Sequence, residues 1–585
     1  MLKGLLFFIK HSWKYDRLYI IWRVAYQFVN SLIPIIATLL PKYIIDELMG
    51  QKRPETLMLY VGVLAGYTLL ATGLSVFWGM DGFTRRCSVN AEFDSRLHQL
   101  LYEADFANIE NPEFLDMQEK AKKFLYCDWH GFGYLLDCAL NIVGQLFTLA
   151  GIAAVIATLN FWIVLLFASL AAVSAIVEGR AKKNAVTLSN QVSGDSRGWM
   201  YYSKLFEDFS YGKELRANAM GKWLLSKERG YFTRVNRNLK KQNDGFIRSG
   251  VIGAVFTFIQ QCAAYGYLIY RVIGENLSIG SFTMYVAAVS AFAASLRSVM
   301  EGLAEIRAYD MYYDNLDQYL SVPANLRKSG KLPLPEGGHK IEFRNVSFRY
   351  GSHGREVLHQ INLTLSQGEK LSIVGENGAG KTTFIKLLTR LYDPTEGEIL
   401  LDGVNVREID YDSYMSLFST VFQDFKLFSF SLADNISLSL PQDPVKIEAA
   451  LRKVGFSSKL DRLPKGLQTA VYKNFEEDGF EPSGGEGQKI ALARALYKNA
   501  PIVVLDEPTA ALDPRAEFEM YRHFHELTEG KTAVYISHRL SSAKFCDHIA
   551  VLEQGRITEY GTHEQLMDRK GTYAELFEMQ AQYYV

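Results

Sequence analysis

The stretch Lys370-Leu-Ser-Ile-Val374-Gly375-Glu-Asn-Gly-Ala-Gly-Lys381-Thr382 decides the fold of the C-terminal half of the chain. Apolar residues followed by glycines and then a helical pattern predict a buried strand, a turn and a helix. The turn matches GxxxxGKS/T, in which backbone N–H groups point at phosphate, the lysine reaches the β- and γ-phosphates of ATP, and the next hydroxyl can bind Mg²⁺. The predicted nucleotide-binding residues of this loop are Gly375, Glu376, Asn377, Gly378, Ala379, Gly380, Lys381, Thr382 and Thr383.

Two more apolar runs further along the chain, 502–505 and 532–536, predict buried strands. A parallel α/β sheet with nucleotide at its strand ends is therefore expected. Asp506 and Glu507 directly follow the first run. Because adjacent residues on a strand point in opposite directions, one carboxylate can hold the metal while the other faces the attacking water. We assign Asp506 to Mg²⁺ and Glu507 to the general base.

A further stretch, Pro482-Ser483-Gly484-Gly485-Glu486-Gly-Gln488-Lys-Ile-Ala-Leu-Ala-Arg494, resembles the signature of the ATP-binding cassette (ABC) ATPases. The remaining elements of that family occur in order along the chain, as Tyr350 in Val-Ser-Phe-Arg-Tyr, Gln423 in Val-Phe-Gln-Asp, Asp513 in Ala-Leu-Asp and His538 in Ile-Ser-His-Arg. The resemblance covers the whole ATPase half and implies a P-loop nucleotide-binding domain. Each of these residues taken alone has an ordinary structural explanation, so the prediction depends on their joint order.

The resemblance also implies a role for each matching residue. Tyr350 would stack on adenine, Gln423 would sense Mg²⁺ and the attacking water, and His538 would contact the γ-phosphate. Asp513 would bridge two such sites. The expected catalytic residues are Glu507, His538 and Gln423, and the expected Mg²⁺ ligands are Thr382, Gln423 and Asp506.

Ser483, Gly484, Gly485 and Glu486 are expected to bind nucleotide from the other side, by closing over the γ-phosphate that a second subunit holds. The signature departs from the usual family pattern at two positions, where Pro482 and Glu486 replace Leu and Gln. A proline just before a helix is tolerated. Glu486 keeps an acceptor for a ribose hydroxyl but brings a negative charge near the triphosphate, which predicts weaker binding across the subunits.

Apolar runs long enough to cross about 30 Å of hydrocarbon occur only before residue 310 or so. Six membrane spans are predicted, at 18–45, 56–80, 134–158, 161–180, 246–273 and 281–308. The long basic connections and both termini are expected in the cytoplasm, and the short loops outside. The N-terminal residues fit a short amphipathic helix on the membrane surface. We therefore predict an all-α transmembrane domain over 1–322, a Pro- and Gly-rich linker over 323–339 and an α/β ABC nucleotide-binding domain over 340–585.

Polar residues inside the predicted spans leave two explanations open: a solute pathway, or structural bonds, which are hydrogen bonds between helices or, for Arg297 and Glu301, a local i,i+4 ion pair. They are Arg23, Gln27, Asn30, Asn141, Gln145, Gln260, Gln261, Arg297 and Glu301. By positional analogy with ABC exporters, helices that couple the ATPase to the membrane domain are expected near 115–120 and 204–214. Plain solvated helices are the alternative.

Composition limits the remaining possibilities. The net charge of -1 gives no reason to expect nucleic acid as a partner, and the five cysteines show no metal-ligand or disulfide spacing.

The resemblance to ABC proteins, together with the predicted spans, implies a half-transporter of the cell membrane that uses ATP and Mg²⁺, and as a dimer exports an amphipathic drug, lipid or peptide. A homodimer is preferred over a heterodimer in which this chain is the catalytic half. An ATP-gated or regulatory membrane protein is the alternative from another class. An importer is disfavoured because importers usually place the two parts on separate chains.

Overall fold

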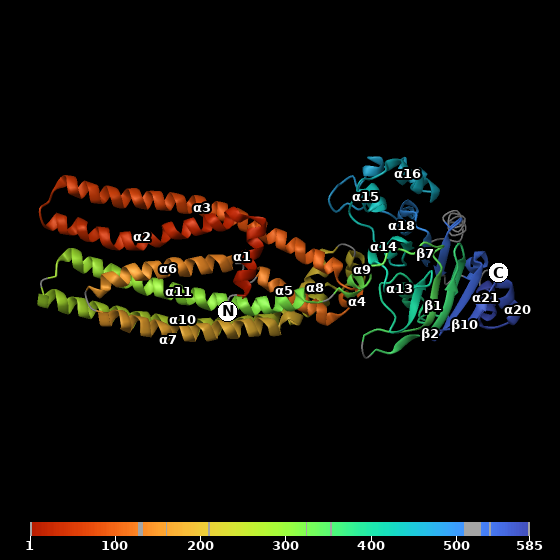
Figure 1. Ribbon diagram of the computed structural model, residues 1–585, viewed down its shortest axis with the longest axis horizontal. Coiled ribbons are helices and arrows are strands. Elements are labelled where there is room, and N and C mark those ends of the chain that lie inside the picture. Colours follow the sequence, from red (N-terminus) through yellow and green to blue (C-terminus); the bar gives the residue numbers. More distant parts are fainter. Residues whose placement is uncertain are drawn as a thin grey trace. The chain divides into compact units, whose positions relative to one another are not determined.

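The computed structural model describes residues 3–126, 133–158, 161–208, 211–275, 277–322, 324–351, 354–507, 528–536 and 540–582. The chain forms two compact units (Figure 1). The helical unit comprises Met1–Ala104 and Asn111–Val322, and the α/β unit comprises Asp105–Glu110 and Pro323–Val585. The second unit therefore includes a short segment from within the N-terminal half.

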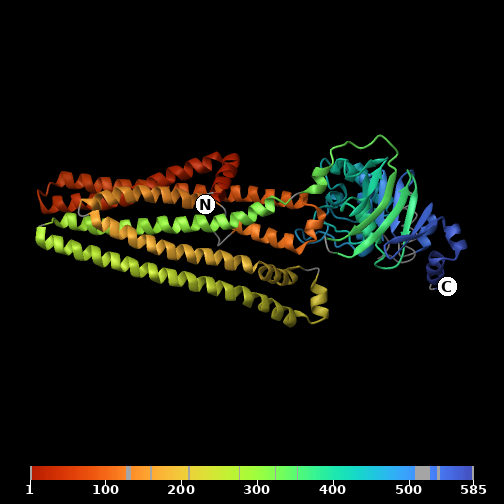
Figure 2. The same ribbon diagram turned by 60° about the horizontal axis from the view of Figure 1, so that its bottom comes forward.

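The helical unit consists of helices, and the longest of them run side by side (Figure 2). They are α1 (Lys3–Tyr15), α2 (Arg17–Met49), α3 (Pro54–Glu103), α5 (Pro112–Tyr126), α6 (Tyr134–Ala157), α7 (Phe161–Gln191), α8 (Ser193–Glu207), α9 (Gly212–Ala217), α10 (Gly221–Glu275) and α11 (Ile279–Leu320). Side-chain caps fix two of the starts. Asp16 accepts from the N–H of Tyr19 at the start of α2, and Ser278 accepts from the N–H of Ser281 at the start of α11.

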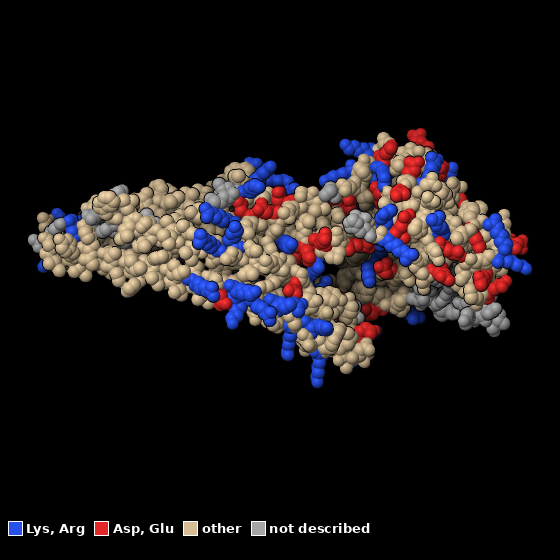
Figure 3. Space-filling view, turned by 90° about the horizontal axis from the view of Figure 1, so that it is seen from below, with Lys and Arg blue, Asp and Glu red and all other residues tan. Residues whose placement is uncertain are grey.

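Five of the described helices, α2, α3, α6, α10 and α11, are long and apolar enough to cross a membrane. At most 39% of the residues in the most apolar window of each helix are buried in the chain, so these helices present apolar surface outward, as lipid-facing helices do. The fourth predicted span, 161–180, is helical as the first part of α7. Figure 3 shows one face of this unit, where a broad band without charged side chains covers the helices and lysines and arginines gather beyond it.

The α/β unit contains two sheets. The smaller has the order β2-β1-β4-β5, from β1 (Ile341–Arg349), β2 (Glu356–Leu365), β4 (Glu396–Leu401) and β5 (Val404–Asn405), and is antiparallel. The larger has the order β10-β9-β3-β8-β7-β6, from β3 (Lys370–Val374), β6 (Phe418–Val421), β7 (Ile502–Asp506), β8 (Thr532–Ile536), β9 (His548–Glu553) and β10 (Arg556–Gly561). The strands predicted at 370–374, 502–505 and 532–536 are confirmed as β3, β7 and β8, and they pair in parallel.

Two hydrophobic cores organise the helices of the α/β unit. The first lies between the sheets and α13 (Lys381–Leu388), and includes Ile373, Phe384 and Leu388. The second includes Leu432, Phe456 and Ile490 and packs a group of helices, here called the helical subdomain, against strands β6, β7 and β8 (Figure 1). That subdomain contains α15 (Leu432–Ser437), α16 (Pro444–Lys453), α17 (Ser457–Leu460), η3 (Gly466–Gln468) and α18 (Gly484–Lys498). The remaining helices are α12 (Asn325–Ser329), α14 (Tyr411–Ser416), η4 (Leu540–Phe545), α20 (His563–Arg569) and α21 (Thr572–Gln582).

The short helix α4 (Phe106–Ile109), between α3 and α5 in the sequence, packs as part of the α/β unit. The Asp105 carboxylate accepts from the N–H groups of Asn325 and Leu326 at 3.0 Å each. Glu110 accepts from Nζ of Lys386 at 2.9 Å and from the Tyr392 hydroxyl. Residues 105–110 are therefore bound within the α/β unit, although the rest of that unit begins only at residue 323.

The two segments in which coupling helices are expected, 115–120 and 204–214, both belong to the helical unit. Residues 115–120 lie inside α5. The second predicted segment, 204–214, covers the end of α8 and the start of α9, apart from residues 209–210, which lie outside the described residues.

Candidate nucleotide-binding site

The phosphate-binding loop connects β3 to α13, and two of its glycines are required by its backbone. Gly375 has φ 152° and Gly380, at the N-cap of α13, has φ 107°. A side chain at Gly375 would place its Cβ 2.2 Å from the carbonyl oxygen of Leu552 on β9. Only glycine accommodates both the conformation and the close approach, so the loop reaches the helix N-terminus in a shape that can receive an anion.

The ammonium group of Lys381 lies over this loop. It is buried and donates to the carbonyl oxygens of Gly375 at 2.8 Å and Glu376 at 2.9 Å. Burial lowers the pKa of Lys381, while the negative charges of Glu507 and Asp506 act in the opposite direction. The cation is thus held between the loop and two carboxylates, where a phosphate group would meet it.

The two carboxylates at the end of β7 differ in environment. Asp506 is 3% exposed, and burial followed by the charge of Glu507 raises its pKa to about 6. Glu507 has φ 47°, and its N–H donates to the carbonyl of Ile536 at 2.9 Å. The left-handed backbone at Glu507 turns the chain out of the sheet. The side chains of Asp506 and Glu507 therefore lie in different surroundings, although they are consecutive.

Gln423 follows β6 and meets Glu507 directly. Its Nε2 donates to Oε2 of Glu507 at 2.8 Å. The structure therefore brings together Gln423 and Glu507, which the sequence predicted as neighbours of the attacking water, although they lie 84 positions apart.

The residues present fit a magnesium ion that shares its coordination with a nucleotide. Asp506 is a buried carboxylate beside a second carboxylate, an arrangement that a cation would stabilise. The Thr382 side chain is exposed at the start of α13. Among the described residues no group of three or more His, Cys, Asp and Glu could hold a metal ion alone. Mg²⁺ is commonly held by one or two carboxylates together with substrate phosphates, so this donor set suits it.

Tyr350 lies at the end of β1, against the start of α13. Its hydroxyl is 3.0 Å from Oγ1 of Thr383, and its ring meets the rings of Phe348 and Tyr392 edge to face with centroids 4.9 and 5.4 Å apart. Nζ of Lys386 lies 5.4 Å from the Tyr350 ring centroid. The ring is thus fixed close to the phosphate-binding helix.

The signature lies in the helical subdomain, at the start of α18. Ser483 is the N-cap and forms a capping box, in which its Oγ accepts from the N–H of Glu486 at 3.3 Å and the Glu486 carboxylate accepts from the N–H of Ser483 at 2.8 Å. Ser483 and Gly484 are exposed and Gly485 is half-buried. The N-terminus of α18, where the helix dipole favours an anion, is therefore exposed.

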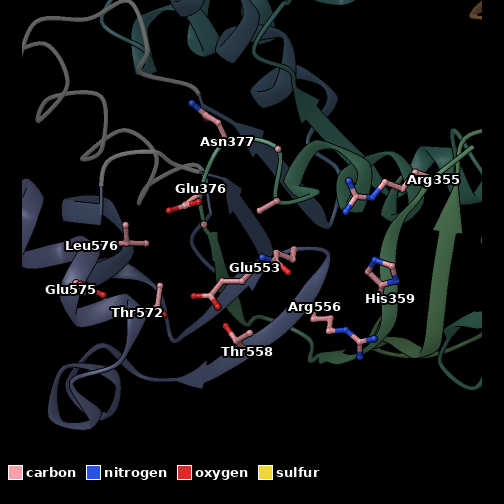
Figure 4. A pocket seen from close by; sticks show the side chains of 14 residues that line it. Arg355, His359, Glu376, Asn377, Glu553, Arg556, Thr558, Thr572, Glu575 and Leu576 are labelled. Atoms are coloured by element: carbon pink, nitrogen blue, oxygen red, sulfur yellow. The ribbon is translucent and has the colours of Figure 1, made fainter.

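Two predicted site residues, Asp513 and His538, lie outside the described residues. The structure adds residues that the sequence analysis missed. A cavity of about 740 Å³ lies against the phosphate-binding loop at Glu376 and Asn377 (Figure 4). Its other lining side chains include Arg355, His359, Glu553, Arg556, Thr572 and Glu575. Arg355 directly precedes β2, and the others come from strands β2, β9 and β10 and from α21. They belong to no motif, so a single sequence gives no signal for them.

Comparisons with known proteins agree with this site. The ABC transporter family model matches residues 358–510, which include the phosphate-binding loop, the signature and both carboxylates. An ATP-dependent lipid A-core flippase of Alkalilimnicola ehrlichii is 34% identical over 448 residues, covering 75% of this chain and 74% of that one. The chain belongs to the ABC transporter family. It is an exporter-type member with a fused membrane part and ATPase, and a multi-pass membrane protein.

Two further similarities extend over almost the whole length of this ABC exporter. The subtilin transport ATP-binding protein SpaT of Bacillus subtilis is 28% identical, covering 99% of this chain and 95% of that one. The structure of a bacterial Atm1-family ABC exporter with ATP bound superposes with a TM-score of 0.79 at 20% identity, and covers 97% of this chain and 99% of that one. The second comparison shows a shared fold.

Several polar side chains of the exporter's membrane helices bond to side chains of a neighbouring helix. Nε of Arg23 on α2 donates to Asp137 on α6 at 2.7 Å, and Nδ2 of Asn141 on α6 donates to Ser298 on α11 at 2.8 Å. Arg297 and Glu301 form the predicted i,i+4 pair at 3.3 Å, with both side chains about half exposed. Hydrogen bonds between helices are thus confirmed for Arg23 and Asn141, and a local ion pair is confirmed for Arg297 and Glu301.

Proposed function

We propose that this chain forms a homodimer that exports an amphipathic solute, powered by ATP hydrolysis at two composite sites. The observation that carries the proposal is the hydrogen bond from Gln423 to Glu507 at 2.8 Å, next to Lys381 and the phosphate-binding loop. A base with a partner that orients it supports turnover rather than ATP binding alone.

In the proposed reaction, the loop from Gly375 to Gly380 and the ammonium of Lys381 hold the β- and γ-phosphates. Glu507 takes a proton from the attacking water, and Gln423 holds Glu507 and that water in line with the γ-phosphate. Mg²⁺ at Asp506 and Thr382 would neutralise charge that develops on the phosphates. Tyr350 binds adenine, and His538 contacts the γ-phosphate.

Dimerisation is inferred from where the two half-sites lie within one chain. The phosphate-binding loop belongs to the first hydrophobic core, whereas Ser483 caps a helix of the second core and is exposed. Two copies placed head to tail would close each signature over the other copy's ATP. A heterodimer with a second half-transporter is the alternative, because nothing in this chain excludes a different partner.

The substrate class is proposed from the membrane helices and the relatives. The five described helices long enough to span expose apolar surface, and the most apolar window of each holds at most two charged residues, which suits a molecule with a long apolar part. The similar proteins are named for a lipid A-core and for subtilin. We therefore propose a lipid or a peptide as cargo, with export toward the side that the short loops face.

Transport in proteoliposomes tests the proposal. The chain, with ATP supplied outside, is expected to concentrate a fluorescent lipid or a fluorescent apolar peptide inside, and Glu507→Gln to concentrate neither. Downhill flow that needs ATP but continues in Glu507→Gln would show an ATP-gated channel and contradict export. Whichever probe also stimulates ATP hydrolysis identifies the cargo class.

Topology is tested by labelling with an impermeant thiol reagent in a chain whose five native cysteines are replaced by serine. A cysteine at Gly50, which is exposed in the turn after α2, is expected to label from outside the cell. A cysteine at Lys183 on α7 is expected to label only after the membrane is opened. The reverse pattern would contradict both the orientation and the direction of export.

A further inference from the structure

The carboxylate at the start of the signature helix is held by two groups. Oε2 of Glu486 accepts from the N–H of Ser483 at 2.8 Å, and Oε1 lies 3.0 Å from Nζ of Lys459. The side chains of Lys459 and Glu486 are 34% and 26% exposed, so solvent screens the pair only partly. Glu486 is thus directed back over the N-cap.

Lys459 reaches Glu486 from a segment that is firmly anchored. Its helix α17 is fixed in the second core by Phe456, 1% exposed, and Leu460, 7% exposed. Nζ of Lys459 also lies 5.4 Å from the ring centroid of Phe480, just before the signature. Lys489 on α18 donates to the carbonyl of Gly455 at 3.0 Å, which ties the turn before α17 to the signature helix. The Lys459 ammonium is therefore held in place beside the N-terminus of α18.

A positive charge is needed there because two anions compete for one helix N-terminus. The free N–H groups at the start of α18 would attract the γ-phosphate, and they equally attract the Glu486 carboxylate. Partial burial would raise the pKa of Glu486, but the bonds from the Ser483 backbone and from Lys459 lower it below its usual value. The carboxylate is ionised at neutral pH and would repel a triphosphate if nothing balanced it.

We propose that Lys459 is a positioning residue of the composite ATP site, which neutralises Glu486 and holds its carboxylate aside so that Ser483, Gly484 and Gly485 can receive the γ-phosphate. The inference rests on the proposed function, because it requires the signature to meet ATP held by a second copy. It explains how this chain functions with a glutamate where a neutral glutamine is usual. Lys459 acts through Glu486 and does not itself touch the nucleotide.

The test uses the full-length chain in detergent or lipid, with ATP KM and kcat measured at saturating Mg²⁺. Lys459→Met is expected to raise the KM for ATP by about tenfold with kcat nearly unchanged, because a charge near the phosphates is left unbalanced. Lys459→Arg should keep the wild-type KM, because it retains the charge. The inhibition constant of ADP should not change in Lys459→Met, because ADP has no γ-phosphate for the signature to bind.

The same lysine substitution is then made in a chain that already carries Glu486→Gln. In that variant no carboxylate remains to be balanced, so adding Lys459→Met should leave the KM unchanged. Lys465→Met is the matched control, since Lys465 is a lysine of the same subdomain that pairs with Glu476 at 2.7 Å and Asp478 at 3.0 Å, away from the signature. Its KM should equal that of the wild type.

Two results would overturn the inference while leaving the proposed function intact. An active wild type with an unchanged KM in Lys459→Met shows that Glu486 needs no partner. An equal rise of the KM in the Glu486→Gln background shows that Lys459 merely supports the fold of the subdomain. A wild-type chain that hydrolyses no ATP alone is a different result, because it overturns the homodimer and this inference together.

Discussion

The phosphate-binding loop of the α/β unit and the buried polar pairs of the membrane helices differ in how far apart in the sequence the interacting residues lie. In the α/β unit, Lys381 bonds to the carbonyls of Gly375 and Glu376, six and five positions away. In the helical unit, Arg23 meets Asp137 across 114 positions and Asn141 meets Ser298 across 157. This difference explains why the phosphate-binding loop can be identified as a motif in the sequence, whereas the polar pairs of the membrane helices cannot. A helix bundle brings its partners together only after it folds.

The largest effect that tests this contrast is expected at Glu507. Glu507→Gln should lower ATP turnover by about 10²–10⁴-fold, because the general base is lost, while ATP binding persists. Turnover and nucleotide binding are measured on the same purified protein. Glu448→Gln, at an exposed glutamate that pairs with Arg452, serves as control and should be unaffected. Turnover within a few-fold of wild type in Glu507→Gln would rule out its role as base.

A smaller effect, on binding rather than on chemistry, is expected at the loop. Lys381→Ala should weaken ATP binding by about 10–100-fold, because it removes a charged donor from the phosphates. Equilibrium binding of a fluorescent ATP analogue measures it. Lys531→Ala, at a half-buried lysine that bonds to Asn499, is the control. An unchanged affinity for ATP in Lys381→Ala would contradict the role of Lys381 in binding the phosphates.

In the helical unit the same kind of substitution should affect stability. Asp137→Ala leaves Arg23 and Arg86 without the carboxylate they share, at 2.5 and 3.4 Å, and should lower the free energy of unfolding by about 1–3 kcal/mol. Thermal unfolding in detergent measures the loss. Asp195→Ala, which removes the more exposed pair with Arg234, should cost less. A loss at Asp137 no greater than that at Asp195 would contradict the structural role of the buried pair.

The smallest effect is expected between Asn141 and Ser298. A double-mutant cycle with alanine at both positions should give a coupling energy of about 0.6 kcal/mol, typical of hydrogen bonds between membrane helices. Transport should persist in both single variants. Loss of transport without loss of stability in Asn141→Ala would instead place Asn141 in the solute pathway and reverse our assignment.

The sequence predicted the α/β sheet well because each of its buried strands is a continuous apolar run that borders a turn of distinctive composition. It gave no signal for α4, because a helix of four residues is too short to show a helical period. It also left the charge of Glu486 unexplained. Lys459 lies in a different helix, and only the fold of the subdomain brings its ammonium to the signature.

A substitution at Ser483 tests most directly whether the ATPase site is shared between two chains. The account predicts that the purified chain alone forms a dimer that hydrolyses ATP, and that Ser483→Arg lowers hydrolysis to background while ATP still binds to the loop of each copy. A bulky cation at that N-cap blocks only the half-site offered to the second copy. Hydrolysis that survives in Ser483→Arg, or that occurs in a monomer, would contradict a composite site shared between two chains.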